Sequence, residues 1–260
     1  MISGWLSTRL DKFRTRSAHA HMSSSLPEGT IIYAIGDIHG RLDLLQQLEE
    51  KIERDAADVD ADQRVIVCLG DYIDRGDDSR GVIEHLVQAP PQSFERVCLT
   101  GNHEDYLLRF LEDSTVGPAW LLNGGRGTLM SYCISPPEWA DLEGSLQIVQ
   151  TNLRSCMPEA HVAFLRALEL SYRNGDYLFV HAGIRPNMPL SRQDPHDLIW
   201  IREEFVSNKS DHGAVIVHGH SVRHKPDNLA NRIGVDTGAY ATGRLTCVVL
   251  SGSTRRFLTT

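Results

Sequence analysis

The sequence has few cysteines and no long apolar run, and each of these features argues against a class of protein. No hydrophobic stretch approaches the roughly 20 residues that a membrane-spanning helix needs. The N-terminus has no continuous apolar segment of the kind found in secretory signals. The five cysteines lack the spacing of a disulfide framework, which favours a reducing compartment. We therefore expect a cytoplasmic protein without a membrane span.

Basic residues are also fewer than acidic residues. The 260 residues carry 34 acidic side chains against 26 basic ones, for a net charge of −8, and only four of the basic residues are lysine. This balance argues against a general nucleic-acid binder, which usually presents a basic face. The hydrophobic fraction of 41% is ordinary for a globular protein, and a chain of this length can bury a full core.

Most of the chain repeats a pattern of apolar run, polar motif and helical segment. This is the strand–helix–strand rhythm of an α/β domain with a largely parallel sheet. Helical periodicity follows the first two runs, at 41–55 and 82–87. The apolar runs, of which the last is expected to be antiparallel, lie at 30–35, 64–69, 97–99, 177–180, 214–217, 233–235 and 244–250.

Two segments stand outside this rhythm. We expect residues 1–28 to form a flexible leader ahead of one domain that spans residues 29–255. A short amphipathic helix in the leader, docked on a membrane surface or a partner, is an alternative. Residues 105–175 carry helical periodicity instead of strands. They predict a helical insertion that lies over the sheet edge and contributes to substrate selection.

Five of the polar motifs at strand ends contain side chains that bind metals. Because the carboxyl ends of strands share one crevice in α/β folds, groups far apart in sequence can meet there. Carboxylate, imidazole and amide ligands without thiolate suit Mn, Fe or Zn and disfavour a structural zinc cage. The candidates are too numerous for one ion, which predicts two ions roughly 3.5–4 Å apart. They are Asp37, His39, Asp71, Asn102, His103, His181 and His220.

Taken in order, these motifs resemble the signature of the phosphoprotein phosphatases, which are calcineurin-like metallophosphoesterases. The motifs are GDIHG at 36–40, GDYIDRG at 70–76, GNHE at 101–104, HAG at 181–183 and GHS at 219–221. The segment WIR at 200–202 is similar to a Trp-x-Arg segment of the bacterial and phage branch. The resemblance covers about residues 30–250. It implies a β-sandwich of two mixed sheets flanked by helices, with a dinuclear metal centre at the sheet ends.

The resemblance also implies the metal ligands. Two divalent ions, expected to be Mn²⁺ with Fe or Zn as alternatives, would share the carboxylate of Asp71. The first ion would be held by Asp37, His39 and Asp71, and the second by Asp71, Asn102, His181 and His220.

Roles in catalysis follow from the same resemblance. A hydroxide that bridges the two ions would attack phosphorus directly. His103 would protonate the departing alkoxide, and Asp74 would fix the tautomer of His103 and raise its pKa. Arg75, Arg202 and Asn102 would bind the substrate phosphate.

Several positions bear on the substrate. Val222 stands where nuclease and phosphodiesterase branches usually carry histidine. Asp74 and Glu104 follow the protein-phosphatase form, whereas symmetrical diadenosine-tetraphosphate hydrolases typically have alanine and aspartate there. Thr100 replaces an arginine that is frequent in phage-type enzymes, so one phosphate contact is either absent or supplied by Arg126.

These features predict a metal-dependent serine/threonine protein phosphatase, with phosphotyrosine as a further substrate to be tested. Its partner would be a phosphorylated protein or peptide, and nucleic acid is not expected as a partner. A hydrolase of dinucleoside polyphosphates or other small phosphoesters is the alternative. A metal-binding scaffold that docks a phosphorylated partner without turnover is the third.

Overall fold

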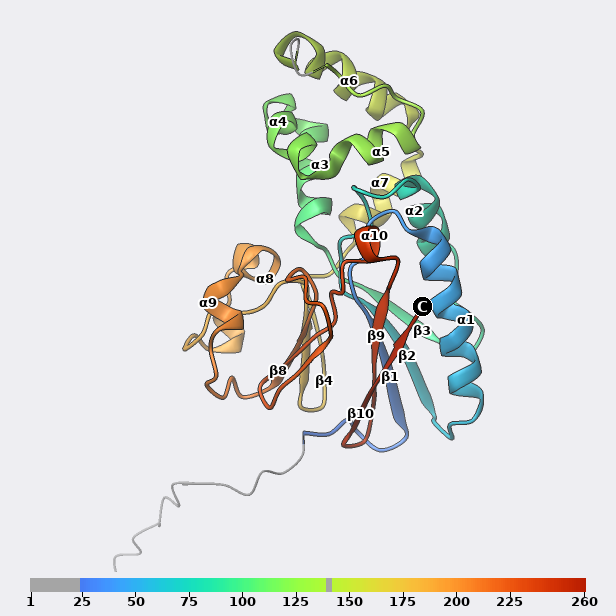
Figure 1. The fold of residues 1–260 in the computed structure, drawn as a ribbon, viewed down its shortest axis with the longest axis vertical. Coiled ribbons are helices and arrows are strands. Elements are labelled where there is room, and N and C mark those ends of the chain that lie inside the picture. Colours follow the sequence, from blue (N-terminus) through green and yellow to red (C-terminus); the bar gives the residue numbers. More distant parts are fainter. Residues whose placement is uncertain (1–23, 139–141) are drawn as a thin grey trace, which may run out of the picture.

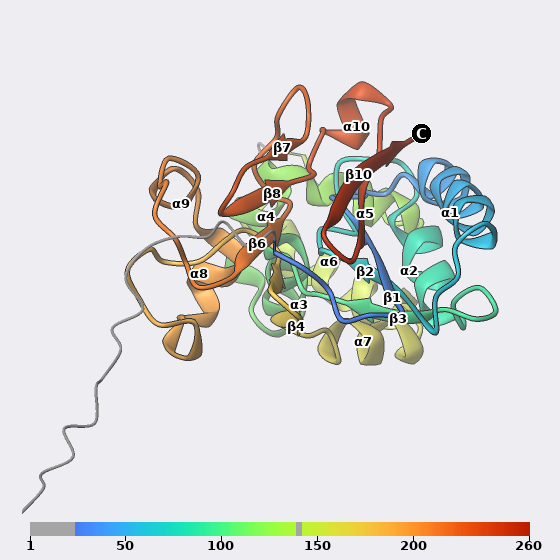
Figure 2. The ribbon, with the colours of Figure 1, turned by 90° about the horizontal axis from the view of Figure 1, so that it is seen from below.

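The computed structural model describes residues 24–138 and 142–260, and within these residues the strands form two five-stranded sheets. Figures 1 and 2 show the two sheets beside one another, with α1 and α2 outside the first and α8 and α9 outside the second. Both sheets contain parallel and antiparallel pairs, so the two mixed sheets implied by the family resemblance are confirmed. The single, largely parallel sheet expected from the chain's rhythm alone is wrong.

The first sheet has the strand order β10-β9-β1-β2-β3. Its central strands β1, β2 and β3 are parallel, and β9 pairs antiparallel with β1, as predicted for the last apolar run. β10 was not predicted because its sequence, TRRFLT, has no continuous apolar run. The bounds are β1 (Thr30–Ile35), β2 (Gln63–Cys68), β3 (Glu95–Cys98), β9 (Thr246–Ser251) and β10 (Thr254–Thr259), with α1 (Leu42–Ala57) and α2 (Ser79–Val87) between the first three.

The second sheet has the order β4-β5-β6-β8-β7. β5, β6 and β8 are parallel, while β4 and β7 are antiparallel edge strands. β4 lies at the end of the segment predicted to be helical; its residues, SYRN, pair with β5 across a turn at Gly175, where φ is 55°. The bounds are β4 (Ser171–Asn174), β5 (Tyr177–Val180), β6 (Val215–His218), β7 (Asp227–Asn228) and β8 (Arg232–Gly234), with α8 (Pro195–Trp200) and α9 (Glu203–Val206) between β5 and β6.

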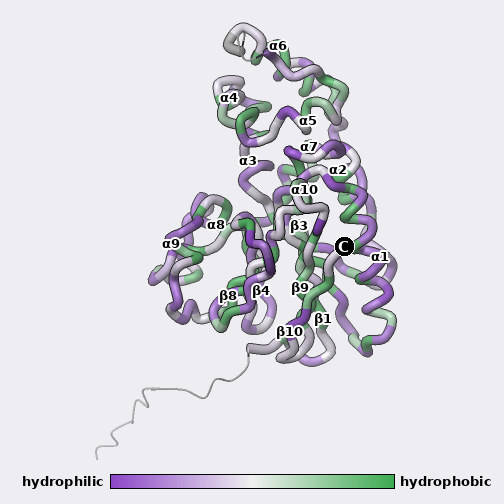
Figure 3. Tube along the Cα trace, viewed as in Figure 1, coloured by the Kyte–Doolittle hydropathy of each residue, from purple (hydrophilic) through white to green (hydrophobic). Residues whose placement is uncertain are grey.

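Apolar side chains fill the space between the sheets and the layers outside them. Ile32 and Ala34 of β1 face the second sheet, whereas Ile31, Tyr33 and Ile35 face the helices on the outer side. All six residues of β1 are buried, which explains its continuous apolar run in the sequence. Each fully buried isoleucine contributes about 1.5–3 kcal/mol. Figure 3 shows the apolar residues concentrated along β1 and β9.

A set of helices lies beyond the carboxyl ends of β1, β2 and β3 (Figure 1). Most of them belong to the chain between β3 and β4, and α10 lies close to the same strand ends. None of the helices in the described residues is long and apolar enough to cross a membrane. The helices are α3 (Asn102–Glu112), α4 (Gly117–Trp120), a π-helical turn (Leu121–Gly125), α5 (Arg126–Ser131), α6 (Leu142–Cys156), α7 (Glu159–Arg166) and α10 (Ala239–Thr242).

Most of the expected leader, up to residue 23, lies outside the described residues. Residues 24–28 contact the sheets: Leu26 is buried and its N–H donates to the carbonyl of Gly252, 3.0 Å away. The carbonyl of Ser24 accepts from the hydroxyl of Tyr177 at 3.0 Å. The described part of this segment is therefore packed against the domain.

Candidate active site

The predicted ligands follow the carboxyl ends of strands in both sheets. Asp37 and His39 come after β1, Asp71 comes after β2, and Asn102 begins α3 after β3. In the second sheet, His181 directly follows β5 and His220 lies two residues beyond β6. Each of these side chains is buried. These side chains lie close together because the two sheets place their strand ends at one location.

The backbone is strained at this location. Eight non-glycine residues of the described chain have a positive φ, and five of them are predicted site residues. A left-handed conformation costs a non-glycine residue about 1–2 kcal/mol, and such residues cluster at functional sites. The five are His39 (φ 47°), Asp71 (52°), Asp74 (71°), Arg75 (69°) and His220 (60°).

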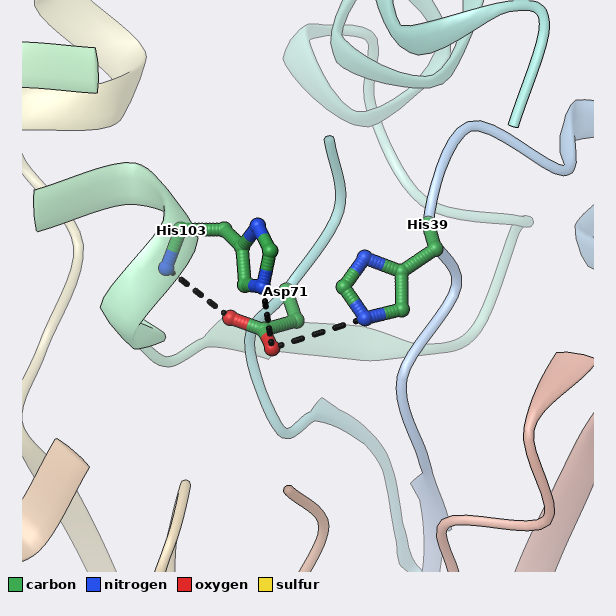
Figure 4. Close-up of side chains that lie close together, drawn as sticks. All are labelled: His39, Asp71 and His103. Carbon is green, nitrogen blue, oxygen red and sulfur yellow. Dashed lines mark hydrogen bonds and ion pairs between the residues drawn. The ribbon is translucent and has the colours of Figure 1, made fainter. Parts of the chain in front are cut away.

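One group of possible ligands surrounds the Oδ2 atom of Asp71 (Figure 4). The Nε2 atom of His39 lies 3.6 Å from it, and the Nε2 atom of His103 lies 3.8 Å from it. Asp37 Oδ2 is 4.0 Å from His39 Nε2. His39 turns Nε2 toward the carboxylates because its Nδ1 donates to the carbonyl of Ile73 at 2.8 Å.

A second group surrounds the other oxygen of the same carboxylate. His181 Nε2 lies 3.4 Å from Asp71 Oδ1, 3.1 Å from Asn102 Oδ1 and 3.2 Å from His220 Nδ1. The Nδ1 atom of His181 donates to the carbonyl of Leu69 at 2.8 Å, which directs Nε2 into the group. Asp71 thus belongs to both groups, as the predicted bridging role requires.

The electrostatics of the site fit divalent metal ions. Burial, together with the carboxylates of Asp236 and Asp71, raises the pKa of Asp37 well above its usual range, and a nearby cation would relieve this repulsion. Burial lowers the pKa of His39 to about 3 and that of His220 to about 2, so both rings are neutral at pH 7. The Nε2 atom of His39 is buried without a hydrogen-bond partner in the described residues. Neutral imidazoles beside paired carboxylates are ligands for Mn, Fe or Zn.

His103 and Asp74 form a buried pair. The Nδ1 atom of His103 lies 2.7 Å from Asp74 Oδ2. Burial alone would lower the pKa of His103, but the carboxylates of Asp71 and Asp74 outweigh it, and the pKa is raised. With Nδ1–H donating to Asp74, the Nε2 atom faces the ligand cluster and is the ring nitrogen that would gain or release a proton.

The helical segment fixes Asp74 in a way that the sequence did not predict. Trp120 Nε1 donates to Asp74 Oδ2 at 2.9 Å, and Thr128 Oγ1 donates to Asp74 Oδ1 at 2.5 Å. The N–H of Asp74 in turn donates to Ser79 Oγ at 2.9 Å. A buried indole N–H requires a hydrogen-bond acceptor. The presence of Trp120 was therefore the feature of the sequence that could have indicated this contact. These contacts hold the carboxylate in one orientation toward His103.

The predicted phosphate-binding arginines border the same cluster. Arg75 Nη2 lies 3.3 Å from His103 Nε2, and its guanidinium lies 4.7 Å from the ring centre of Tyr240, a contact that the sequence did not predict. The exposed Arg202 donates from Nη1 to the carbonyl of His220 at 3.2 Å. Arg126 donates to the carbonyl of Pro137 at 2.6 Å, and its role toward the substrate stays a prediction.

Glu104 was identified in the sequence as part of the GNHE motif, but its contacts in the site were not predicted. One of its carboxylate oxygens accepts from the N–H groups of Asp71 (2.8 Å) and Gly101 (2.9 Å), and the other accepts from the N–H of Tyr72 (2.8 Å). The glutamate therefore shapes the loop that carries Asp71. His218, two residues before His220, is buried next to Phe205, with ring centres 5.1 Å apart.

Replacing Glu104 by glutamine should reduce the free energy of unfolding by about 1–3 kcal/mol, because an amide NH₂ cannot accept from backbone N–H groups. Urea unfolding of metal-free protein measures this. Glu50→Gln, a change at an exposed carboxylate, serves as the control and should stay within about 0.5 kcal/mol of the parent. Equal stabilities of the two variants would show that the Glu104 contacts contribute nothing.

The sequence matches the calcineurin-like phosphoesterase family over residues 31–249. The chain belongs to that family. The phosphoesterase is therefore a hydrolase of phosphoesters, and its two groups of histidine and aspartate are suited to the divalent metals that the family uses.

Curated relatives of this phosphoesterase differ in substrate. A serine/threonine-protein phosphatase 1 from Salmonella typhimurium (strain LT2) is 27% identical over 228 residues, covering 83% of this chain and 89% of the relative. A bis(5'-nucleosyl)-tetraphosphatase PrpE (asymmetrical) from Bacillus thuringiensis (strain Al Hakam) is 28% identical over 232 residues, covering 82% and 88%. The crystal structure of a putative diadenosine tetraphosphatase shares the fold, with a TM-score of 0.57, 19% identity and coverage of 92% and 94%.

Proposed function

We propose that this phosphoesterase removes phosphate from phosphoserine and phosphothreonine in proteins or peptides. The observation that carries the proposal is the buried His103–Asp74 pair, 2.7 Å apart, beside the ligand cluster. Aspartate at position 74 follows the protein-phosphatase form of the motif, and the Salmonella relative supports the same reading. The free state of all five cysteines supports a cytoplasmic location.

The metal-binding residues would carry two divalent ions, for which we propose Mn²⁺. When bound, such ions activate water for attack on phosphorus and neutralise charge on the phosphoryl oxygens. The ligands would be Asp37, His39, Asp71, Asn102, His181 and His220.

The remaining chemistry belongs to side chains. Arg75 and Arg202 bind the phosphoryl oxygens and stabilise the charge that develops on them, with Asn102 beside them. His103 gives the proton on Nε2 to the oxygen that leaves phosphorus, so the products are a neutral serine or threonine hydroxyl and inorganic phosphate. Asp74 keeps the Nδ1 proton of His103 in place and stabilises the ring's positive charge before the transfer.

The raised pKa of His103 leads to a pH prediction. The general acid is lost as pH rises through the pKa of His103, which produces the descending alkaline limb of kcat. Asp74→Asn removes a carboxylate that favours the protonated ring, so this limb should move to lower pH. Profiles of kcat against pH for the parent, Asp74→Asn and the control Asp105→Asn test this. An alkaline limb that stays in place in Asp74→Asn would remove Asp74 from the mechanism.

The asymmetrical tetraphosphatases are about as similar to this chain as the protein phosphatase, so hydrolysis of dinucleoside polyphosphates is the second candidate. Comparing kcat/KM of the Mn²⁺-loaded protein on a phosphoserine peptide and on diadenosine tetraphosphate distinguishes the two. We expect the peptide to be the better substrate. A strong preference for the nucleotide would overturn the proposed substrate.

A further inference from the structure

Three consecutive residues, Arg223, His224 and Lys225, form an exposed basic segment that we call the rim. In the part of the chain that the structure describes, their side chains make no hydrogen bond or ion pair. Such a run stands out in a protein with a net charge of −8. The nearest acidic side chain in sequence, Asp227, is already paired with Arg232 at 3.1 Å.

The rim is fixed next to the active site by its backbone. It begins three residues after the predicted ligand His220. The N–H of Arg223 donates to the carbonyl of Asp236 at 2.9 Å, and the carbonyl of His224 accepts from Arg244. Asp236 precedes the turn that leads to Tyr240, whose ring lies 5.4 Å from that of His39. The rim is therefore attached to the turn that borders the ligand cluster.

Some exposed cations of the fold are paired with carboxylates, and several near the site are not. Arg185 and Arg256 are each paired with a carboxylate, Asp197 and Asp55. Arg75, Arg202, Arg223 and Lys225 have no carboxylate partner among the described residues. In the proposed function, Arg75 and Arg202 bind the single phosphoryl group of the substrate. No anion has yet been proposed to bind the positively charged rim.

We infer that the rim binds carboxylates that flank the phosphorylated residue, so that the protein prefers acidic phosphopeptides. This inference rests on the proposed function. Consecutive Cα atoms are about 3.8 Å apart, so acidic residues one to three positions from the phosphoresidue extend beyond the catalytic arginines. Exposed ion pairs are individually weak, so two of them together should change kcat/KM by about three- to tenfold.

The test compares two phosphoserine peptides, identical except that the flanking residues are glutamate in one and glutamine in the other. Parent protein should favour the glutamate peptide by about three- to tenfold in kcat/KM, mainly through KM. The double variant Arg223→Gln, Lys225→Gln should lose this preference. The control Arg54→Gln, Arg154→Gln makes the same change of net charge at exposed arginines on α1 and α6, and should retain it.

Turnover of p-nitrophenyl phosphate, which has no flanking charge, reports the catalytic centre and should stay within about twofold in all variants. Equal kcat/KM for both peptides with the parent, or an unchanged preference in the rim variant, would overturn the inference alone. If the rim variant lost kcat/KM only on diadenosine tetraphosphate, the inference would be overturned and the rim would instead bind polyphosphate. Hydrolysis of p-nitrophenyl phosphate without hydrolysis of either peptide would contradict the proposed function and the inference together.

Discussion

Replacing His103 by asparagine is expected to lower kcat by about 10²- to 10⁴-fold while the bound metal ions are retained. Asparagine cannot supply the proton that the raised pKa of His103 keeps available near neutral pH. The N–H of residue 103, which donates to Asp71 Oδ1 at 3.1 Å, belongs to the backbone and survives the substitution. Steady-state kinetics with p-nitrophenyl phosphate, together with elemental analysis of the same sample, measures both quantities.

His196→Asn provides the matched control for this prediction, because it removes an exposed imidazole that stacks on Trp200 outside the ligand cluster. It should leave kcat within about twofold of the parent. Unchanged turnover in the His103 variant would exclude His103 as the general acid. Loss of metal from that variant would assign His103 to the ligands, in keeping with its place in the first group around Asp71.

Replacing Asp71 by asparagine is expected to have the second large effect, on metal content. Asp71 belongs to both groups of possible ligands, so the loss of its negative charge weakens both metal positions at once. We expect metal content after dialysis to fall from about two ions per chain to below one, with turnover falling in parallel. Elemental analysis and isothermal titration with Mn²⁺ measure the change.

Asp105→Asn is the control for Asp71→Asn. Asp105 is on α3 near the site, but its carboxylate pairs with Arg109 at 3.3 Å. This variant should bind metal like the parent. If Asp71→Asn kept two ions with parental affinity, Asp71 would not bridge them, and the arrangement of ligands proposed above would be wrong.

The convergence of the site was predictable because its signals are local. Asp37, Asp71 and His181 each follow a continuous apolar run, and such runs are typical of strands buried on both faces. Parallel strands bring their carboxyl ends to one place, so the order of strands in the sheets was not needed to predict that the motifs meet. The architecture of two mixed sheets came from the family resemblance instead, since the rhythm alone suggested one sheet.

The parts that were missed depend on contacts between distant residues. Trp120 and Thr128 bind Asp74 across 46 and 54 residues of sequence, from a helical segment whose periodicity says nothing about hydrogen bonding. Glu104 accepts hydrogen bonds from backbone N–H groups. Nearly every residue has such a group, so the sequence does not indicate which ones Glu104 contacts. β10 was missed because one partner strand, β9, is enough to hold a sequence with little apolar character at the sheet edge.

The helical segment also contacts the loop that carries Asp74 and Arg75. The carbonyl of Gly124 accepts from the N–H of Arg75 at 3.1 Å, in the same stretch of chain that supplies Trp120 and Thr128 to Asp74. Gly124 has a φ of 111° and a side chain there would overlap Arg75, so glycine is required at this position. The segment thus orients the proposed acid and a phosphate-binding arginine together.

Titration of metal-free protein with Mn²⁺ tests the account most directly, because the two-metal centre underlies every role assigned to the other residues. Phosphate release from p-nitrophenyl phosphate should be absent without metal and should rise to a plateau as about two ions bind per chain. Full activity in metal-free protein, or two bound ions without any release of phosphate, would contradict a two-metal phosphoesterase centre.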